Sequence, residues 1–420
     1  MRLTKLKCEG YRGFSNQQIV LDPQLTLLVG ANGAGKSSVL DGLHVLLSHY
    51  SARLVASPSS AARIQETDIR RNFEEATLRL YATDDRVGQI SWSISKRGPR
   101  QRVMKPIGES KLTGLNEFAR AIAERSDQGH FLRGEVAPIY YDQSRAILKI
   151  PKRHRTSADS AALAVFWDSL GELGIDFPKL SSWFKDRETD ELRRQKTRAN
   201  YQDRELEAVR RAMTTATGFK APYFSVDAPR GLTFTKGKAT LHVSQLSTGE
   251  QVFLALAGDL ARRLASLADK DTLPLHARAI VLIDEIELHL HPRWQRAIIP
   301  WLLKTFPNCQ FVISTHSPQV LSEVEARHIR ILDDSPKGTR IKTTRSTFGR
   351  DSNHLLVSLF GVPQRREVAD KLIAQADKAV TNGQLKEAGT LIARLKGEIE
   401  GAPPEIAVLE ARLARRISVK

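Results

Sequence analysis

One stretch near the start of the chain constrains the fold more than any other, the segment LTLLVGANGAGKSSVL at residues 25–40. Its apolar half predicts a buried strand and its last residues the start of a helix, with a glycine-rich turn between them. Gly30, four further residues and then Gly35, Lys36 and Ser37 have the spacing of a phosphate-binding P-loop. Glycines there let successive backbone N–H groups point at one anion beside the helix N-terminus. The segment therefore predicts a phosphate site in an α/β fold.

Two residues of this loop have specific expected roles in binding a nucleotide. Lys36 would reach the β- and γ-phosphates, and the Ser37 hydroxyl would hold Mg²⁺. A glycine-rich turn before a helix can also be a plain packing device, but the full match in this context favours the phosphate site. The residues expected to contact a nucleotide are Gly30, Ala31, Asn32, Gly33, Ala34, Gly35, Lys36, Ser37 and Ser38.

Composition is typical of a soluble globular protein. The 420 residues are 41% hydrophobic and 26% charged, enough for two or three domains or for one large α/β domain with insertions. No apolar run approaches the roughly 18 residues of a membrane span, and Met1 opens directly into a strand pattern without a secretory signal. Cys8 and Cys309 each lie in a predicted strand, so we expect reduced core cysteines in a cytoplasmic protein.

The formal net charge of +17 is the second informative feature. An excess of this size indicates a polyanionic partner, of which nucleic acid is the commonest. A generally basic, well-solvated surface would give the same count, because charge alone does not say where the cations lie.

Apolar periodicity predicts an antiparallel β region, then a helical middle. Two strands within residues 1–28 precede the P-loop strand, and the helix after the loop is predicted to run to about Tyr50. Residues 157–217 have a helical pattern. The segment 224–243 predicts a small sheet, with a turn at 236–238 between two alternating strands.

Three later segments carry chemistry expected at the carboxyl edge of a parallel sheet. LSTGEQ at 246–251 precedes an apolar helix, and its serine and glycine make a second anion-accepting helix start. The apolar run AIVLI ends in Asp284 and Glu285; Asp284 can orient Mg²⁺, and Glu285 can position or deprotonate an attacking water. A strand at 310–313 then ends in STHSP, which places His316 at the same edge.

With these motifs in this order, the chain resembles the ATP-binding-cassette (ABC) class of ATPases, in the soluble branch that includes RecF, Rad50, SMC proteins and the OLD-type ATPases. The resemblance covers residues 1–50 and 240–335 and implies ATP and Mg²⁺ as ligands. It assigns Walker A to residues 30–38, the signature motif to 246–251, the Walker B pair to Asp284 and Glu285, and the γ-phosphate-sensing switch histidine to His316.

The same resemblance implies a twofold homodimer with two ATP molecules sandwiched between the subunits. Ser247 and Gly249 of one subunit would complete the site built on Lys36 of the other. Residues 287–292 would form the D-loop that touches the partner. A metal site at His289 and His291 is the alternative, but no third ligand lies nearby in sequence.

Two further positions leave alternatives open. Gln143 ends a short apolar strand between Walker A and the signature motif. It is either the glutamine that bridges Mg²⁺ and the attacking water or a plain turn residue. Arg12, in the turn YRGF, matches the position where the soluble branch places an arginine near the nucleotide, or it is an exposed turn arginine.

The run DEIELHLHPRWQ at 284–295, with STHSPQVL, looks closely like a bacterial group of stand-alone ATPases that includes the PtuA-type ATPases of Septu and retron anti-phage systems. This implies an HNH-type nuclease as partner. The span 144–245 is too short for the coiled coils of Rad50 and SMC proteins, and the spaced acids of an OLD nuclease domain are absent after Asp334. The chain itself is therefore expected not to be a nuclease. A RecF-like repair ATPase, a transporter subunit and a freestanding nuclease are the alternatives.

We therefore predict an α/β ABC-ATPase fold with an N-terminal antiparallel β-subdomain, a mostly helical insertion and a C-terminal helical tail. Three amphipathic helices are expected in the tail, at 365–380, 384–400 and 404–417. They either pack on the ATPase domain or dock a partner. The predicted parts are 1–150 and 224–348 for the two halves of the ATPase domain, 151–223 for the insertion and 349–420 for the tail.

Overall fold

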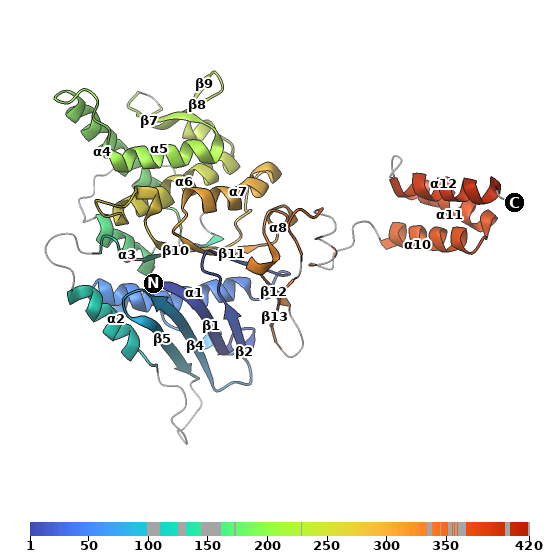
Figure 1. Ribbon diagram of the computed structural model, residues 1–420, viewed down its shortest axis with the longest axis horizontal. Helices are drawn as coiled ribbons and strands as arrows, with labels where there is room; N and C mark the ends of the chain where they lie inside the picture. The colour runs from blue at the N-terminus through green and yellow to red at the C-terminus, as the bar shows by residue number, and fades with distance from the viewer. Residues whose placement is uncertain are drawn as a thin grey trace. The chain divides into compact units, whose positions relative to one another are not determined.

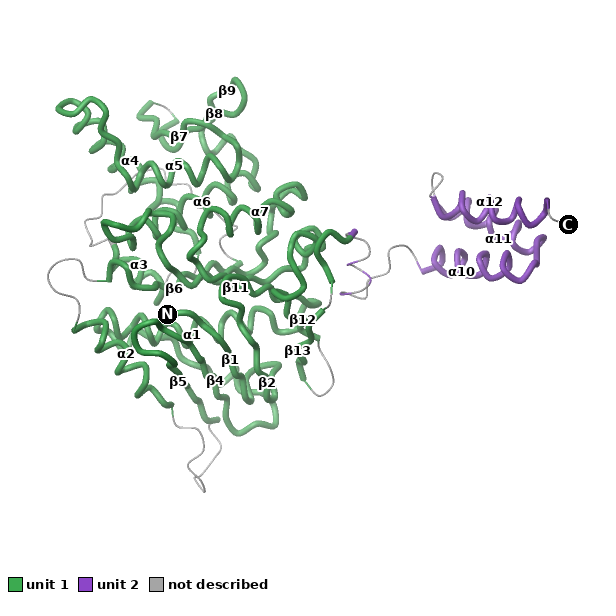
Figure 2. The backbone as a smooth tube through the Cα atoms, in the orientation of Figure 1, with its two compact units in different colours: residues 1–350 green, residues 351–420 purple. Residues whose placement is uncertain are grey.

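The computed structural model describes most of the chain in two compact units, Met1–Arg350 and Asp351–Lys420 (Figure 2). The second unit begins at Asp351, close to the tail boundary predicted at 349. The described residues are 1–98, 110–124, 132–143, 161–171, 174–227, 229–333, 338–344, 346–351, 355, 357, 359, 367–399 and 404–418.

A six-stranded sheet in the order β13-β12-β3-β11-β10-β6 carries the P-loop. Figure 1 labels its strands β10, β11, β12 and β13. Neighbouring strands are parallel except for β12 and β13. Every residue of β3, β6, β10 and β11 is buried, as uninterrupted apolar runs predict for strands covered on both faces. The strands are β3 (Leu25–Val29), β6 (Ala137–Tyr141), β10 (Ala279–Ile283), β11 (Gln310–Thr315), β12 (Ile329–Asp333) and β13 (Arg340–Lys342).

Helix α1 (Lys36–Leu54) follows the P-loop and packs against strands of this sheet and of a second, antiparallel sheet in the order β2-β1-β4-β5. The helix extends beyond the predicted end near Tyr50, because Tyr50 and the residues after it still bury apolar surface; the Tyr50 ring packs against Phe118 and Phe166. Phe118 lies on α2 (Thr113–Glu124). The second sheet contains β1 (Arg2–Tyr11), β2 (Phe14–Val20), β4 (Glu75–Asp84) and β5 (Gly88–Arg97).

Helices dominate the middle of the first unit. They are α3 (Ala161–Gly171), α4 (Phe177–Gln195), α5 (Arg204–Thr217), the buried α6 (Thr248–Leu267), α7 (Pro292–Thr305) and α8 (Pro318–Leu321). None of the helices in the described ranges combines the length and apolar content needed to cross a membrane. Residues 151–160 of the predicted insertion lie outside the described residues. Both cysteines, Cys8 and Cys309, are free and buried, as predicted.

The small sheet has three strands, β7 (Lys220–Ser225), β8 (Gly231–Lys236) and β9 (Ala239–His242), rather than the two predicted. The start of β7 was not predicted, because Pro222 cannot donate a ladder hydrogen bond and is unusual within a strand. The strand also contains a register shift between Lys220 and Tyr223. The predicted turn at 236–238 is confirmed as the β8–β9 hairpin.

The second unit contains α10 (Glu367–Thr381), α11 (Leu385–Glu398) and α12 (Pro404–Ser418). Their apolar faces form one shared core, which includes Leu372, Leu395 and Leu409. The apolar stripe predicted on α11 is therefore used inside this unit. Residues 365–366 and 400–403, which belong to the predicted helices and the break between them, lie outside the described residues.

Candidate nucleotide site

Four buried parallel strands end side by side at the edge that carries the P-loop. Strand β11 pairs with both β3 and β10, and β6 pairs with β10 on its other side. Their carboxyl ends bring together the P-loop after β3, Gln143 after β6, Asp284 after β10 and Thr315 at the end of β11. This is the edge at which ligands bind in open α/β sheets.

The backbone of the P-loop depends on its glycines. Gly35 is left-handed, with φ 96°, immediately before the first residue of α1, and a Cβ there would lie 3.1 Å from the Phe14 ring. A Cβ on Gly30 would lie 2.3 Å from the backbone oxygen of Leu332. Any larger residue at either position would shift the loop. The exposed side of the loop consists of Ala31, Asn32 and Gly33, whereas Ala34 is buried and Ser37 and Ser38 are partly buried.

The Lys36 ammonium group is held by its own loop, 3.0 Å from the carbonyl oxygens of both Gly30 and Ala31. Burial lowers the pKa of Lys36, and the three carboxylates that follow β10 act in the opposite direction. The lysine is therefore placed within the loop, where a P-loop lysine meets nucleotide phosphates.

The three residues predicted to hold Mg²⁺ meet at one carboxylate oxygen. Asp284 Oδ2 accepts hydrogen bonds from Ser37 Oγ at 2.8 Å and from Gln143 Nε2 at 3.3 Å. Carboxylate, hydroxyl and amide oxygens are hard ligands that fit Mg²⁺ when phosphate and water supply the rest. Across the described ranges no three His, Cys, Asp or Glu side chains group around a possible metal position, His289 and His291 included. The residues present thus fit Mg²⁺ bound together with a nucleotide.

Glu285 lies in residues 284–291, which we name the Walker B turn. His316 lies in residues 314–317, which we name the switch loop, and the two side chains face each other. His316 Nε2 lies 3.8 Å from Glu285 Oε1, and both side chains are about one-quarter exposed. Burial, and next the nearby Lys36, lower the pKa of His316. The imidazole is therefore neutral at pH 7 and can accept or donate a hydrogen bond.

Arg12 contacts carboxylates rather than the P-loop. Its Nη1 donates to Asp41 on the second turn of α1 at 2.6 Å, and its Nε donates to Asp68 at 2.8 Å. Tyr140 on β6 donates to the other oxygen of Asp41 at 2.9 Å. Arg12 thus joins a polar network beside α1, and among the described contacts none ties it to residues 30–38.

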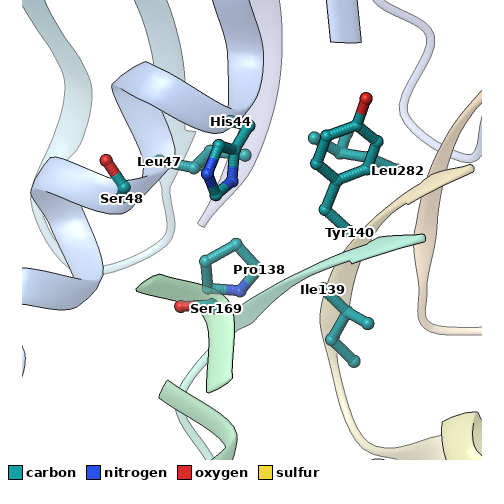
Figure 3. Close-up of a pocket in the computed structure, with 8 residues that line it drawn as sticks. All are labelled: His44, Leu47, Ser48, Pro138, Ile139, Tyr140, Ser169 and Leu282. Carbon is teal, nitrogen blue, oxygen red and sulfur yellow. The ribbon is translucent and has the colours of Figure 1, made fainter. Parts of the chain in front are cut away.

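A small cavity lies beside this network, between α1, β6 and β10. Figure 3 shows His44 on α1 and Tyr140 on β6 in its wall, and their ring centroids are 5.5 Å apart. Its volume of about 10 Å³ is enough for a single water at most. The cavity therefore cannot hold a nucleotide, whose place is the open edge at the strand ends.

The predicted signature motif begins α6 with a capping box. The Ser247 hydroxyl accepts from the Glu250 N–H, and the Glu250 carboxylate accepts from the Ser247 N–H at 2.8 Å. A Cβ on Gly249 would lie 2.4 Å from the backbone oxygen of His289 in the Walker B turn. Within the described residues no hydrogen bond joins Ser247 or Gly249 to the P-loop of the same chain.

Several residues of the site carry no signal that sequence reasoning used. Ser314 donates to Asp284, and Glu287 accepts hydrogen bonds from the switch loop. Both residues lie in segments in which the sequence analysis assigned a catalytic role only to other residues. Asp41 has no other acid near it in sequence, and Asp68 follows Glu66 in a short polar segment. Asp41 lies one helical turn after Ser37, and this spacing could have identified it as a site residue. No local pattern identifies Asp68 as one.

Comparisons with known proteins indicate the family of the chain. A family model described as "AAA domain" matches residues 5–216, half of the chain, and a second one, "AAA domain, putative AbiEii toxin, Type IV TA system", matches residues 140–322. The chain is similar to the retron Ec83 probable ATPase of Escherichia coli, at 28% identity over 87% of this chain and 77% of that protein.

Two shorter or weaker similarities accompany these. The Septu protein PtuA of Bacillus mycoides is 30% identical over 34% of this chain and 21% of its own length. A solved Smc head domain derived from Pyrococcus furiosus aligns with 82% of this chain and 96% of its own, at 16% identity and a TM-score of 0.49. From the family match and the P-loop geometry, the chain belongs to the AAA domain family, as an ABC-type ATPase related to the retron ATPases, Septu PtuA and RecF.

Proposed function

We propose that this chain is the ATP-hydrolysing subunit of an anti-phage defence system, which dimerises on ATP, binds nucleic acid and controls a separate effector nuclease. The observation that carries the ATPase part is the convergence of Lys36, Asp284, Glu285 and His316 at the carboxyl ends of adjacent parallel strands. The similarity to retron and Septu proteins supports the defence part.

The chemistry follows from the side chains in place. Lys36 and the P-loop N–H groups bind the β- and γ-phosphates of ATP. Mg²⁺, held by Ser37, Asp284 and Gln143, would neutralise charge on those phosphate oxygens. Glu285 orients a water and accepts its proton as the water attacks the γ-phosphate, which yields ADP and phosphate.

His316 completes the site from the neighbouring strand. Its neutral imidazole can hydrogen-bond the γ-phosphate while its other edge faces Glu285. A second copy of the chain brings Ser247 and Gly249 to the nucleotide and closes a dimer, alone or within a higher oligomer. Because hydrolysis removes the bridging γ-phosphate, it opens the dimer and changes what the two copies can hold.

We base nucleic-acid binding on the net charge of +17 and on exposed cations for which the described residues show no ion pair with an acid. Lys196 and Arg198, between α4 and α5, are examples: both are exposed. The nuclease partner, expected to be of the HNH type, would be a separate chain, and cleavage of nucleic acid would belong to it rather than to this protein.

Replacing Glu285 with Gln tests the ATPase assignment. We expect kcat for ATP hydrolysis to fall by about 10²- to 10⁴-fold, because the water loses its proton acceptor. ATP binding should persist, and the variant should run as a stable dimer in size-exclusion chromatography with ATP and Mg²⁺. The exposed Glu325→Gln variant is the matched control. A Glu285→Gln chain that still hydrolyses ATP, or that stays monomeric with ATP, would contradict the assignment.

A further inference from the structure

The Walker B turn and the switch loop are joined by hydrogen bonds along their length. Ser314 donates its hydroxyl proton to Asp284 and accepts from the Glu285 N–H at 2.7 Å. The Ile286 N–H donates to the Ser314 carbonyl at 3.1 Å. Beyond the turn, Ser317 donates to Gln295 on α7 at 2.7 Å. The two loops therefore form one unit rather than two independent connections.

Glu287 contacts the switch loop through both of its carboxylate oxygens. Its Oε2 accepts from the Thr315 hydroxyl at 2.8 Å, and its Oε1 accepts from the backbone N–H of His316 at 2.5 Å. Both bonds are charge-assisted and about twice as strong as neutral ones. Glu285, by contrast, faces the His316 ring. One carboxylate thus holds the backbone of the switch histidine while the other faces its side chain.

The backbone of Glu287 is fixed as well. Its carbonyl accepts from the Leu290 N–H at 2.9 Å, within the turn that contains the left-handed residues Glu285 and His289. On the other side of the turn, the His289 carbonyl oxygen packs closely against Gly249 at the start of α6. A displacement of the α6 start would therefore press on the same turn that holds His316 through Glu287.

We propose that Glu287 is a positioning residue, whose two hydrogen bonds hold His316 beside Glu285 and link this histidine to the turn that contacts the signature helix. This proposal rests on the proposed ATP hydrolysis for its functional consequence. Its structural content, that one carboxylate holds the switch loop, can be measured without nucleotide.

Two substitutions separate the hydrogen bonds of Glu287 from its charge. Glu287→Gln keeps an oxygen for the His316 N–H and an amide donor for the Thr315 hydroxyl, but it removes the charge. Glu287→Ala removes both bonds. Glu325→Gln, on the exposed 3₁₀ turn before β12, removes a carboxylate charge away from the site and serves as the control.

The first measurement is hydrogen exchange of the nucleotide-free full-length chain, followed by mass spectrometry of peptides that contain residues 315–317. We expect exchange there to be about tenfold faster in Glu287→Ala, because the His316 amide loses a bond to a charged acceptor. Glu287→Gln, which keeps a neutral acceptor, should exchange at a rate between those of Glu287→Ala and the wild type, and Glu325→Gln should exchange close to the wild-type rate. Unchanged exchange in Glu287→Ala would overturn the proposal.

The second measurement is steady-state ATP turnover. A displaced His316 should lower kcat in Glu287→Ala by about tenfold or more with little change in KM, and Glu287→Gln should restore most of the rate. If Glu287→Gln loses as much activity as Glu287→Ala, the charge rather than the hydrogen bonds matters and the proposal fails. If the wild-type chain hydrolyses no ATP, the proposed function fails, whereas the exchange experiment still decides whether Glu287 holds the switch loop.

Discussion

Glu285 adopts a backbone conformation that few residues other than glycine adopt. Its φ is 49°, and that of His289 in the same turn is 63°. Such a conformation costs roughly 1–3 kcal/mol and persists only where surrounding contacts hold it. Here the Glu285 N–H donates to Ser314, whose hydroxyl proton goes to Asp284. The strained residue is the predicted catalytic carboxylate, which supports a functional reason for the strain.

Gly249 offers a test at the scale of a single residue. In Gly249→Ala the new methyl group would lie 2.4 Å from the His289 oxygen, so the α6 start or the Walker B turn must move. We expect the free energy of unfolding to fall by about 1–3 kcal/mol. Binding of ATP by the monomer should remain, since the P-loop is untouched, whereas ATP-dependent dimerisation should be lost.

Gly389→Ala is the steric control for this test, since no atom of the described residues, apart from its chain neighbours and its own helix backbone, lies within 4 Å of a Cβ there. Thermal unfolding, a fluorescent ATP analogue and size-exclusion chromatography measure the three quantities. A Gly249→Ala chain that unfolds and dimerises like the wild type would show that the close approach to His289 has no consequence.

At the scale of elements, the α4–α5 hairpin divides its charges unevenly. Near its base the arginines are paired: Arg187 contacts Asp203 and Glu205, and Arg210 contacts Glu188 and Glu191. Residues 192–202, from the last turn of α4 into the connection, contain four cations and no acid, and of these Arg193 pairs with Asp190 on α4. Arg194 stacks on Tyr201 there. This connection has the charge that nucleic-acid phosphates require.

Reversing the charge at two of these positions tests the proposed binding of nucleic acid. In the double variant Lys196→Glu with Arg198→Glu, the slope of log affinity against log salt should become shallower by about 2, because two phosphate contacts are lost. Fluorescence anisotropy with labelled DNA and RNA at several salt concentrations measures it. The double variant Arg120→Glu with Lys304→Glu changes two exposed cations on α2 and α7 and has the same net charge. Equal weakening in both variants would exclude a specific role for the hairpin.

At the scale of the whole molecule, the candidate site and the tail belong to different units. All residues of the candidate site lie in the unit Met1–Arg350, whereas Asp351–Lys420 has its own helical core. Ion pairs between Lys396 and Glu410 and between Arg412 and Asp377 also join its helices. A unit with its own hydrophobic core can in principle fold alone.

If the tail docks the proposed nuclease, a chain ending at Arg350 should bind and hydrolyse ATP like the full chain but no longer recover that nuclease. Tagged protein is purified from its own host, and mass spectrometry identifies what accompanies it. Leu395→Asp provides a full-length variant with the buried core of the tail disrupted, and it should behave like the truncation. Full recovery of the nuclease by the truncated chain would place docking in the first unit. Recovery of only DNA and recombination proteins by the full chain would favour a RecF-like repair function.

The sequence by itself determined the features that depend on short stretches of chain. The P-loop, the buried strand that ends before Asp284 and the helix that begins after Ser247 each need only local spacing, apolar runs or glycine, and the structure has them where they were predicted. Element ends were less predictable, because burial against Phe118 and Phe166 carries α1 past Tyr50.

Only the tertiary structure decided which polar side chains meet across the fold. Arg12 donates hydrogen bonds to Asp41 and Asp68. Gly249 packs against the His289 carbonyl oxygen, and Glu287 accepts a hydrogen bond from the His316 N–H. Each contact joins segments far apart in sequence, and the periodicity of one segment holds no information about the carboxylate or carbonyl that another will bring to it. Parallel strand order and close packing make those pairings, and they appear only once the chain has folded.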